Sequence, residues 1–217
     1  MKKDWQARLA EISAMDRELW SAGTVFAGID EAGRGPLCGP VAAACVVMPP
    51  EPLLLYVDDS KKLTEKRRED LYDRILETAV YARVALASPE EIDRVNILQA
   101  TRRAMAEAAA DAPCSLFLVD AVKSLDVHGE VRGIIHGDAL CYSIAAASIL
   151  AKVTRDRLLR EMDAEYPQYG FAKNKGYGTA EHIAALKKYG PCPVHRRSFI
   201  GHFVDPDMPY QPEGTHD

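Results

Sequence analysis

Hydrophobic residues follow two different spacings along this chain. Short apolar or alternating runs predict five strands, near residues 24–31, 40–48, 79–87, 115–120 and 133–136. Apolar residues three or four positions apart predict five helices, near residues 5–20, 64–78, 89–111, 139–165 and 179–189. Because three strands come before the long helix at 89–111, we expect an α/β fold with a mixed five-stranded sheet that starts antiparallel.

The order of these elements predicts one main domain with small additions at both ends. We expect an N-terminal packing helix within residues 1–21 and a core that contains the sheet over residues 22–165. A helical region over 166–203 is expected to contact the substrate, and the proline-containing segment 204–217 is expected to be a flexible tail.

Two adjacent acids, Asp30 and Glu31, end the first predicted strand, and the turn Gly33-Arg34-Gly35 follows them. Two carboxylates at a strand end need a counter-charge, although a solvated strand terminus would also explain them. Neighbouring residues on a regular strand point to opposite faces. Asp30 and Glu31 can therefore share one cation only if the backbone bends there; otherwise they engage different ions.

The glycines after this pair do not match the common phosphate-binding loops. A P-loop ends in Gly-Lys-Ser/Thr ahead of a helix, whereas Gly33, Gly35 and Gly39 lead into the apolar run 41–48. The dinucleotide-binding pattern also fails, because its third glycine position is Cys38. Nucleotide-cofactor binding is therefore only a minor alternative.

Two further acids stand where a fold can bring them to one site. Asp120 ends the apolar strand 115–120, and Asp138 begins the long helical run, where aspartate is also a favoured N-cap. Four carboxylates without a neighbouring Cys or His group favour a hard cation, Mg²⁺ or Mn²⁺, over zinc. This set of acids indicates phosphoryl-transfer chemistry.

The composition limits the setting in which such chemistry takes place. No apolar run approaches the roughly 20 residues of a membrane span, and the polar start of the chain does not match a signal peptide. The five cysteines form no CxxC pair, which favours a reduced compartment and no zinc site. We therefore expect a cytoplasmic protein without a membrane partner, and a monomer.

The formal net charge of -5 is unusual for a protein that binds nucleic acid, but the basic residues are concentrated in two regions. The first contains Lys61, Lys62, Lys66, Arg67 and Arg68. The second contains Lys173, Lys175, Lys187, Lys188, His195, Arg196 and Arg197. Either run can be a solvated surface, but together with an acidic metal site they favour contact with phosphates.

Five sequence blocks resemble, in order, those of the type 2 ribonuclease H family, and within it the bacterial ribonucleases HII. The blocks are GIDEAGRGP, DSKKLTEKRRE, IAAASILAKVTRD, YPQYGFAKNKGYGT and HRRSF. The resemblance implies a ribonuclease H-like fold and endonucleolytic cleavage of the RNA strand of RNA/DNA hybrids. It also implies cleavage on the 5′ side of a single ribonucleotide embedded in duplex DNA.

The resemblance also implies roles for individual residues. The family's four acidic positions are matched by Asp30, Glu31, Asp120 and Asp138. This match implies two-metal-ion catalysis that leaves 5′-phosphate and 3′-hydroxyl ends.

The substrate contacts are implied in the same way. Gly33-Arg34-Gly35 looks like the family's turn for recognition of the ribose 2′-hydroxyl. Tyr177 matches the family's junction tyrosine, although without the resemblance it would be an ordinary packed loop aromatic. The other residues expected to bind substrate are Ser60, Lys61, Lys62, Arg196 and Arg197.

Some positions depart from the family pattern or lie outside the expected site. Ala121 and Val122 stand where the family usually has Gly-Asn, and His136 stands where it usually has Lys. Asp156 lies about 27 Å along the helix from Asp138, so we expect it to form a structural ion pair, with Arg155 and Arg160 beside it. Structural or surface roles are expected for His182, His195 and His202.

Two other classes of function remain open from the sequence. A non-catalytic module that binds RNA/DNA hybrids would use the same basic residues but has no need of four acids at one point. A metal-dependent nuclease of the same fold with another substrate, such as a DNA junction, would keep the acids. It would need neither the Gly33-Arg34-Gly35 turn nor Tyr177.

Overall fold

The computed structural model describes residues 4–120 and 124–212. Within them, five strands form one sheet in the order β3-β2-β1-β4-β5. The strands are β1 (Phe26–Ala32), β2 (Val41–Val47), β3 (Tyr81–Ala87), β4 (Leu116–Asp120) and β5 (Glu130–Ile134). β2 is antiparallel to both β1 and β3, whereas β4 is parallel to β1 and to β5. The predicted mixed sheet with an antiparallel start is confirmed.

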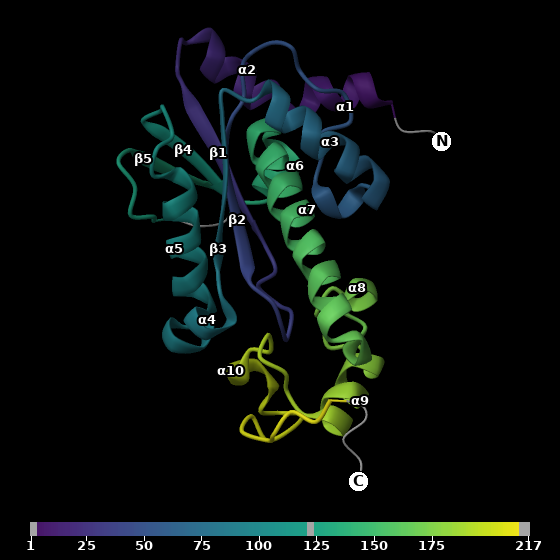
Figure 1. The fold of residues 1–217 in the computed structure, drawn as a ribbon. Coiled ribbons are helices and arrows are strands. Elements are labelled where there is room, and N and C mark those ends of the chain that lie inside the picture. Colours follow the sequence, from purple (N-terminus) through teal and green to yellow (C-terminus); the bar gives the residue numbers. More distant parts are fainter. Residues whose placement is uncertain (1–3, 121–123, 213–217) are drawn as a thin grey trace.

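Helices cover both faces of this sheet and both of its ends (Figure 1). Those in the described residues are α1 (Trp5–Ile12), α2 (Ala14–Ser21), α3 (Glu65–Thr78), α4 (Pro89–Val95), α5 (Ile97–Ala109), α6 (Gly137–Leu140), α7 (Tyr142–Glu165), α8 (Phe171–Asn174), α9 (Ala180–Tyr189) and α10 (Arg197–Ile200). Two 3₁₀ turns are η1 (Ser60–Lys62) and η2 (Pro167–Tyr169). Helices α1 and α2 lie at one end of the molecule, and α9 and α10 lie at the other (Figure 1).

The sheet lies between two helical layers because its central strands, β1 and β2, are buried on both faces. Ile29 of β1 and Ala43 of β2 pack in the cluster that contains α5 residues, whereas Ala44 of β2 packs with residues of α7. Helix α7 approaches β1 very closely at Gly28. A side chain at Gly28 would place its Cβ 2.2 Å from the carbonyl carbon of Ser143.

Three of the predicted helices are shorter than expected, because each is interrupted by one residue. The helix expected over 5–20 breaks at Ser13, and the one over 139–165 breaks at Cys141. The helix over 89–111 breaks at Asn96, which has φ 69° and caps α5 by accepting hydrogen bonds from Leu98 and Gln99. Periodicity continued through these positions, so it could not locate the breaks.

The N-terminus of α7 is capped from a distant part of the chain. Its N-cap residue, Cys141, makes no side-chain capping bond. Instead, Asp16 of α2 is fully buried and accepts hydrogen bonds from the backbone N–H groups of Tyr142 and Ser143, both at 2.9 Å. The hydroxyl of Ser143 donates to the same carboxylate at 2.6 Å. The N-terminal helices therefore support the helix that lines the site.

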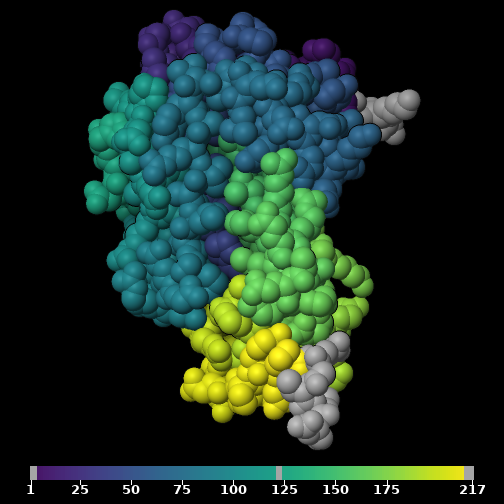
Figure 2. Space-filling model, viewed as in Figure 1, coloured from purple at the N-terminus to yellow at the C-terminus, as the bar shows by residue number. Residues whose placement is uncertain are grey.

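The C-terminal residues form a lobe at one end of the molecule (Figure 2). Its core contains Tyr169, Phe171 and Tyr189, and Tyr210 packs against it. The N–H of Gln211 donates to the carbonyl of Tyr189 at 2.8 Å. Part of the predicted flexible tail, up to residue 212, is thus packed against the lobe, and the rest lies outside the described residues. No helix within residues 4–120 and 124–212 is long and apolar enough to cross a membrane.

We expect the substitution Asp16→Ala to lower the free energy of unfolding by about 3 kcal/mol, because three buried donors at the start of α7 would lose their acceptor. Urea denaturation measures this change. Asp4→Ala is the matched control: it removes the exposed cap of α1 and should lower the same quantity by about 1 kcal/mol. Equal losses in the two variants would contradict the special role of Asp16.

Candidate active site

Three carboxylates from separate parts of the chain meet at one point. One side-chain oxygen from each of Asp30, Asp120 and Asp138 lies within 4.8 Å of the others. Asp30 is only 4% exposed and Asp138 only 6%. Asp30 and Asp120 line a cavity of about 260 Å³. Three of the four acids that were expected to meet are therefore together, and the fourth, Glu31, is not in this group.

The register of two parallel strands brings Asp30 and Asp120 together. Ile29 of β1 lies beside Val119 of β4, so the next residues, Asp30 and Asp120, fall side by side at the carboxyl ends of neighbouring strands. Gly28 faces α7, and because side chains alternate along a strand, Asp30 faces α7 as well. Open α/β sheets carry their sites at this edge.

Asp138 reaches the same point from the short helix α6. It lies in the first turn of α6, whose N-cap is His136 in a left-handed conformation, so the capping role considered for Asp138 is wrong. The N–H of Gly137 donates to Asp120 Oδ1 at 2.8 Å. Lys61 Nζ from η1 lies 3.0 Å from Asp138 Oδ2. The departures at Ala121 and Val122 lie outside the described residues.

Within the part of the chain that the structure describes, Glu31 does not join the group formed by the three aspartates. Strand β1 continues through it with regular pairing, Glu31 beside Ala43 and Ala32 beside Ala42. The backbone therefore does not bend between the two acids, and Glu31 leaves the strand on the side opposite to Asp30. Its Oε1 lies 3.3 Å from Nη1 of Arg34. Glu31 still lines the same cavity, and its role as a metal ligand stays a prediction.

The three aspartates are electrostatically unfavourable without a cation. Burial raises the pKa of Asp30 well above its ordinary value, and the charge of Glu31 raises it further. Burial also raises the pKa of Asp120, although the hydrogen bond from Gly137 opposes this. Neighbouring buried carboxylates resist joint ionisation. A divalent cation would remove this conflict, and the all-oxygen donor set fits Mg²⁺ or Mn²⁺.

The Gly33-Arg34-Gly35 turn is held from inside the protein by Arg196. This side chain is fully buried. Its guanidinium donates to the carbonyl oxygens of Gly33 at 2.7 Å, Arg34 at 3.0 Å, Pro36 at 2.9 Å and Gly39 at 2.9 Å. The predicted direct contact between Arg196 and the substrate is therefore wrong. Two adjacent basic residues in a sequence are typical of an exposed protein surface. The five N–H donors of an arginine can also bind the carbonyl oxygens of a buried turn, as they do here.

A second buried guanidinium, from Arg155 of α7, ties the segment that follows this turn to the C-terminal lobe. It donates to the carbonyls of Cys38, Pro40 and Lys175, each at 3.0 Å. Gly33 has φ 96°, and a Cβ there would lie 2.0 Å from Arg155 Nε. Both the backbone conformation and the space therefore require glycine at this position.

Tyr177 faces the same cavity from the lobe. Its side chain is 48% exposed and lines the cavity with Asp30 and Gly35. A Cβ at Gly35 would lie 3.7 Å from Tyr177 Cε1, so the ring lies over the turn. Local spacing could not show this contact, because 141 residues lie between Gly35 and Tyr177.

The other residues that were predicted to bind substrate have different surroundings. Lys61 is exposed beside Asp138, and Lys62 Nζ lies 3.6 Å from Asp59 Oδ2. Ser60 is buried at the cavity and accepts a hydrogen bond from Ser148 at 2.8 Å. Arg197 is exposed and donates to the carbonyl of Pro206. Contacts of these residues with a substrate stay predictions.

Two of the basic residues have structural roles instead. The guanidinium of Arg67 lies over the ring of Tyr56 at 4.4 Å, and Arg68 donates to the carbonyl of Leu63 at 2.6 Å. The expected ion pair of Asp156 is present, but its partners are Lys152 at 2.7 Å and Arg68 at 3.8 Å.

Besides Arg155, two other residues of α7 that line the cavity, Ser148 and Lys152, were not predicted from the sequence. They are polar positions four residues apart in a helix that is otherwise apolar over this stretch. Four residues is the spacing that places two side chains on one helix face. This pattern was the available signal for a polar face directed at the site.

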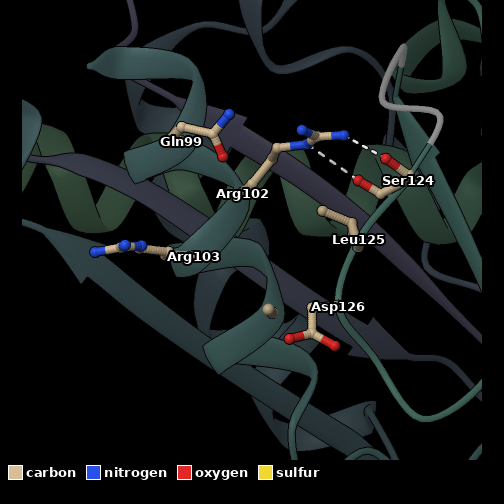
Figure 3. A pocket seen from close by; sticks show the side chains of 7 residues that line it. Gln99, Arg102, Arg103, Ser124, Leu125 and Asp126 are labelled. Carbon is tan, nitrogen blue, oxygen red and sulfur yellow. Dashed lines mark hydrogen bonds between the residues drawn. The ribbon is translucent and has the colours of Figure 1, made fainter. Parts of the chain in front are cut away.

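Another cavity, of about 580 Å³, lies beside α5 (Figure 3). Arg102 closes one side of it by donating to the backbone and hydroxyl oxygens of Ser124. Among the described residues that line it, Asp126 is the single acid, so they offer no converging group of carboxylates. The chemistry therefore belongs to the smaller cavity.

Comparisons with known proteins agree with this geometry. A family model described as ribonuclease HII matches residues 27–202. The chain belongs to the ribonuclease HII family. It is therefore related to endoribonucleases of the ribonuclease H type. It is 50% identical over 201 residues to ribonuclease HII of Acetivibrio thermocellus, covering 91% of this chain and 78% of that protein. It is 53% identical over 206 residues to ribonuclease HII of Desulfitobacterium hafniense, covering 91% and 79%.

Solved structures of ribonucleases HII and H2 share the fold. Ribonuclease H2 of Pyrococcus horikoshii superposes with a TM-score of 0.66 at 28% identity, covering 80% of this chain and 92% of that one. Ribonuclease HII of Archaeoglobus fulgidus, solved in complex with PCNA, gives a TM-score of 0.71 at 26% identity, covering 85% and 97%. The ribonuclease H-like fold implied by the sequence blocks is confirmed.

We expect Mn²⁺ to bind more weakly at pH 6 than at pH 8 in isothermal titration calorimetry. The pKa values of Asp30 and Asp120 are raised, so these acids take up protons at a higher pH than ordinary carboxylates, and protons then compete with the metal. Asp30→Asn should weaken binding at both pH values, whereas the exposed control Asp111→Asn should not. Equal Mn²⁺ affinity of the unaltered chain at the two pH values would contradict a site made of these acids.

Proposed function

We propose that this chain hydrolyses the RNA strand of RNA/DNA hybrids and cuts on the 5′ side of single ribonucleotides embedded in duplex DNA. The products would carry 5′-phosphate and 3′-hydroxyl ends. One observation carries the proposal: Asp30, Asp120 and Asp138 converge, and two of them, Asp30 and Asp120, line a cavity together with Gly35 and Tyr177.

The acids support metal-assisted hydrolysis. Asp30 on β1 lies close to the acids of two neighbouring elements, Asp120 on β4 and Asp138 on α6. These three carboxylates would hold Mg²⁺ or Mn²⁺, and Glu31 would join them by releasing Arg34. Two bound divalent cations supply activation of the attacking water and stabilisation of the leaving 3′-oxygen.

The turn and the tyrosine support selection of a ribonucleotide. The 2′-hydroxyl is the group that distinguishes RNA from DNA at one nucleotide. Backbone groups can approach it where side chains are absent, as at Gly33 and Gly35. The phenol of Tyr177 lies over this turn and can contact the ribose, while its ring offers a surface for stacking.

The two rival classes are less consistent with these features. A binding module gains nothing from burying mutually repelling aspartates, which would also repel a phosphate. A nuclease for all-DNA junctions would not need a buried arginine, Arg196, to fix a glycine turn beside the acids, or a second one, Arg155, to fix the segment that follows the turn.

The decisive experiment compares two labelled duplexes in a gel assay with and without Mn²⁺: one with a single ribonucleotide and one all-DNA. We expect cleavage only of the first, and only with metal. Asp30→Asn should lower the rate about 10³-fold or more, as does loss of a group that stabilises the transition state, with an unchanged circular dichroism spectrum. Undiminished cleavage by Asp30→Asn would refute the assignment, and cleavage of both duplexes would favour the other nuclease class.

We expect Tyr177→Ala to lower kcat/KM at a single embedded ribonucleotide by about 10- to 100-fold, because stacking and ribose contacts are lost. The Mn²⁺ affinity measured by calorimetry should be unchanged, since Tyr177 is not among the converging acids. Tyr177→Phe is the matched control, because it retains the ring and loses only the hydroxyl. Parallel losses of cleavage and metal affinity in Tyr177→Ala would argue against a substrate-binding role.

A further inference from the structure

A buried row of polar side chains runs through the C-terminal lobe and ends at the backbone of Tyr177. Cys192 Sγ lies 3.1 Å from His195 Nδ1. His195 Nε2 lies 3.0 Å from His182 Nε2, and His182 Nδ1 lies 2.9 Å from the carbonyl oxygen of Tyr177. From the sequence, structural or surface roles were expected for both histidines, and His195 was also counted in the basic region that favours contact with phosphates. His195 is instead buried.

The chemistry of these atoms allows one arrangement of protons when both imidazoles are neutral. The carbonyl of Tyr177 can only accept, so His182 Nδ1 carries a proton and His182 Nε2 is an acceptor. His195 Nε2 must then be the donor, which leaves His195 Nδ1 as an acceptor for the S–H of Cys192. The row is therefore a directed chain of three hydrogen bonds that starts at the thiol.

The surroundings keep each group in the required protonation state. Burial lowers the pKa of His195 to about 3 and also lowers the pKa of His182, so both rings are neutral. Burial raises the pKa of Cys192 to about 12, so its thiol keeps the proton that it donates.

Aromatic rings enclose the chain and separate it from water. His195 lies against Tyr169 with ring centroids 4.8 Å apart, and His182 lies against Phe171 at 5.4 Å. Both histidines are buried. In such an environment, a hydrogen bond that loses its partner is not replaced by water, so a change at Cys192 is transmitted along the row.

We propose that Cys192, His195 and His182 are positioning residues that fix the backbone at Tyr177, and thereby place its ring over Gly35 for contact with the ribonucleotide. Cys192 selects the tautomer of His195, and His195 selects that of His182. This inference rests on the proposed function of Tyr177. It adds that substrate selection depends on a thiol in the interior of the lobe.

The matched pair Cys192→Ala and Cys192→Ser separates hydrogen bonding from packing. Alanine removes the donor, and we expect kcat/KM on the duplex with one ribonucleotide to fall about fivefold, the effect of one hydrogen bond. Serine retains an O–H donor and should restore most of that loss. Mn²⁺ affinity should be unchanged in both. Cys45→Ala, which removes a buried thiol from β2, should leave cleavage unaltered.

A double-mutant cycle tests whether the effect passes through Tyr177. In a Tyr177→Ala background, Cys192→Ala should cause no further loss of kcat/KM. Additive losses, or equal losses in Cys192→Ala and Cys192→Ser, would overturn the proposal, because a merely structural role would produce them.

The tautomers provide a readout that does not depend on activity. Nitrogen-15 NMR should show a proton on Nδ1 of His182 and on Nε2 of His195, and Cys192→Ala should shift the His195 proton towards Nδ1, where the carbonyl of Cys192 lies 3.3 Å away. A proton on Nδ1 of His195 in the unaltered chain would overturn the proposal. If the unaltered chain cuts no duplex that contains a ribonucleotide, the proposed function fails, whereas the tautomers still decide whether the chain of hydrogen bonds exists.

Discussion

The structure depends on holding three carboxylates together although they repel one another. Asp30, Asp120 and Asp138 present oxygens within 4.8 Å, and burial adds to the electrostatic penalty that each charge carries. The parallel register of β1 and β4 fixes the first two, and the Gly137 N–H bound to Asp120 ties α6 to the same point. The close approach of α7 at Gly28 completes the arrangement. A flexible scaffold would let the acids separate, so the rigidity of these contacts is what makes a cation site possible.

Two buried arginine side chains stabilise the side of the cavity that lies away from the three aspartates. Arg155 and Arg196 are buried, and their donors are satisfied by backbone carbonyls of the segment 33–40 and of Lys175. These bonds fix the backbone of the glycine turn rather than any side chain. The metal-binding and substrate-recognition parts of the site are thus held by different means. Strand register places the acids, whereas arginine side chains from α7 and the C-terminal lobe place the turn.

The fold was largely predictable, and the errors have a common physical cause. Apolar runs located β1, β2 and β4 well, because burial on both faces demands apolar side chains at nearly every position. The strand predicted at 133–136 overlaps only the last two residues of β5, because β5 is polar and largely exposed. Helix boundaries at Ser13, Asn96 and Cys141 were missed, since a single residue outside helical geometry leaves the apolar period almost unchanged.

The sequence by itself determined which residue types the site has: acids at strand and helix ends, a glycine turn, and a tyrosine in a family-like block. The sequence was sufficient for this because an acid at the end of an apolar run, or a glycine next to a charged residue, can be recognised in a short stretch of chain. Tertiary structure decided which of them meet. It placed Glu31 on the other side of β1 with Arg34 and withdrew Arg196 into the interior. It also joined Cys192 to Tyr177 through two histidines. These outcomes depend on strand pairing and on packing between distant segments, which local spacing does not specify.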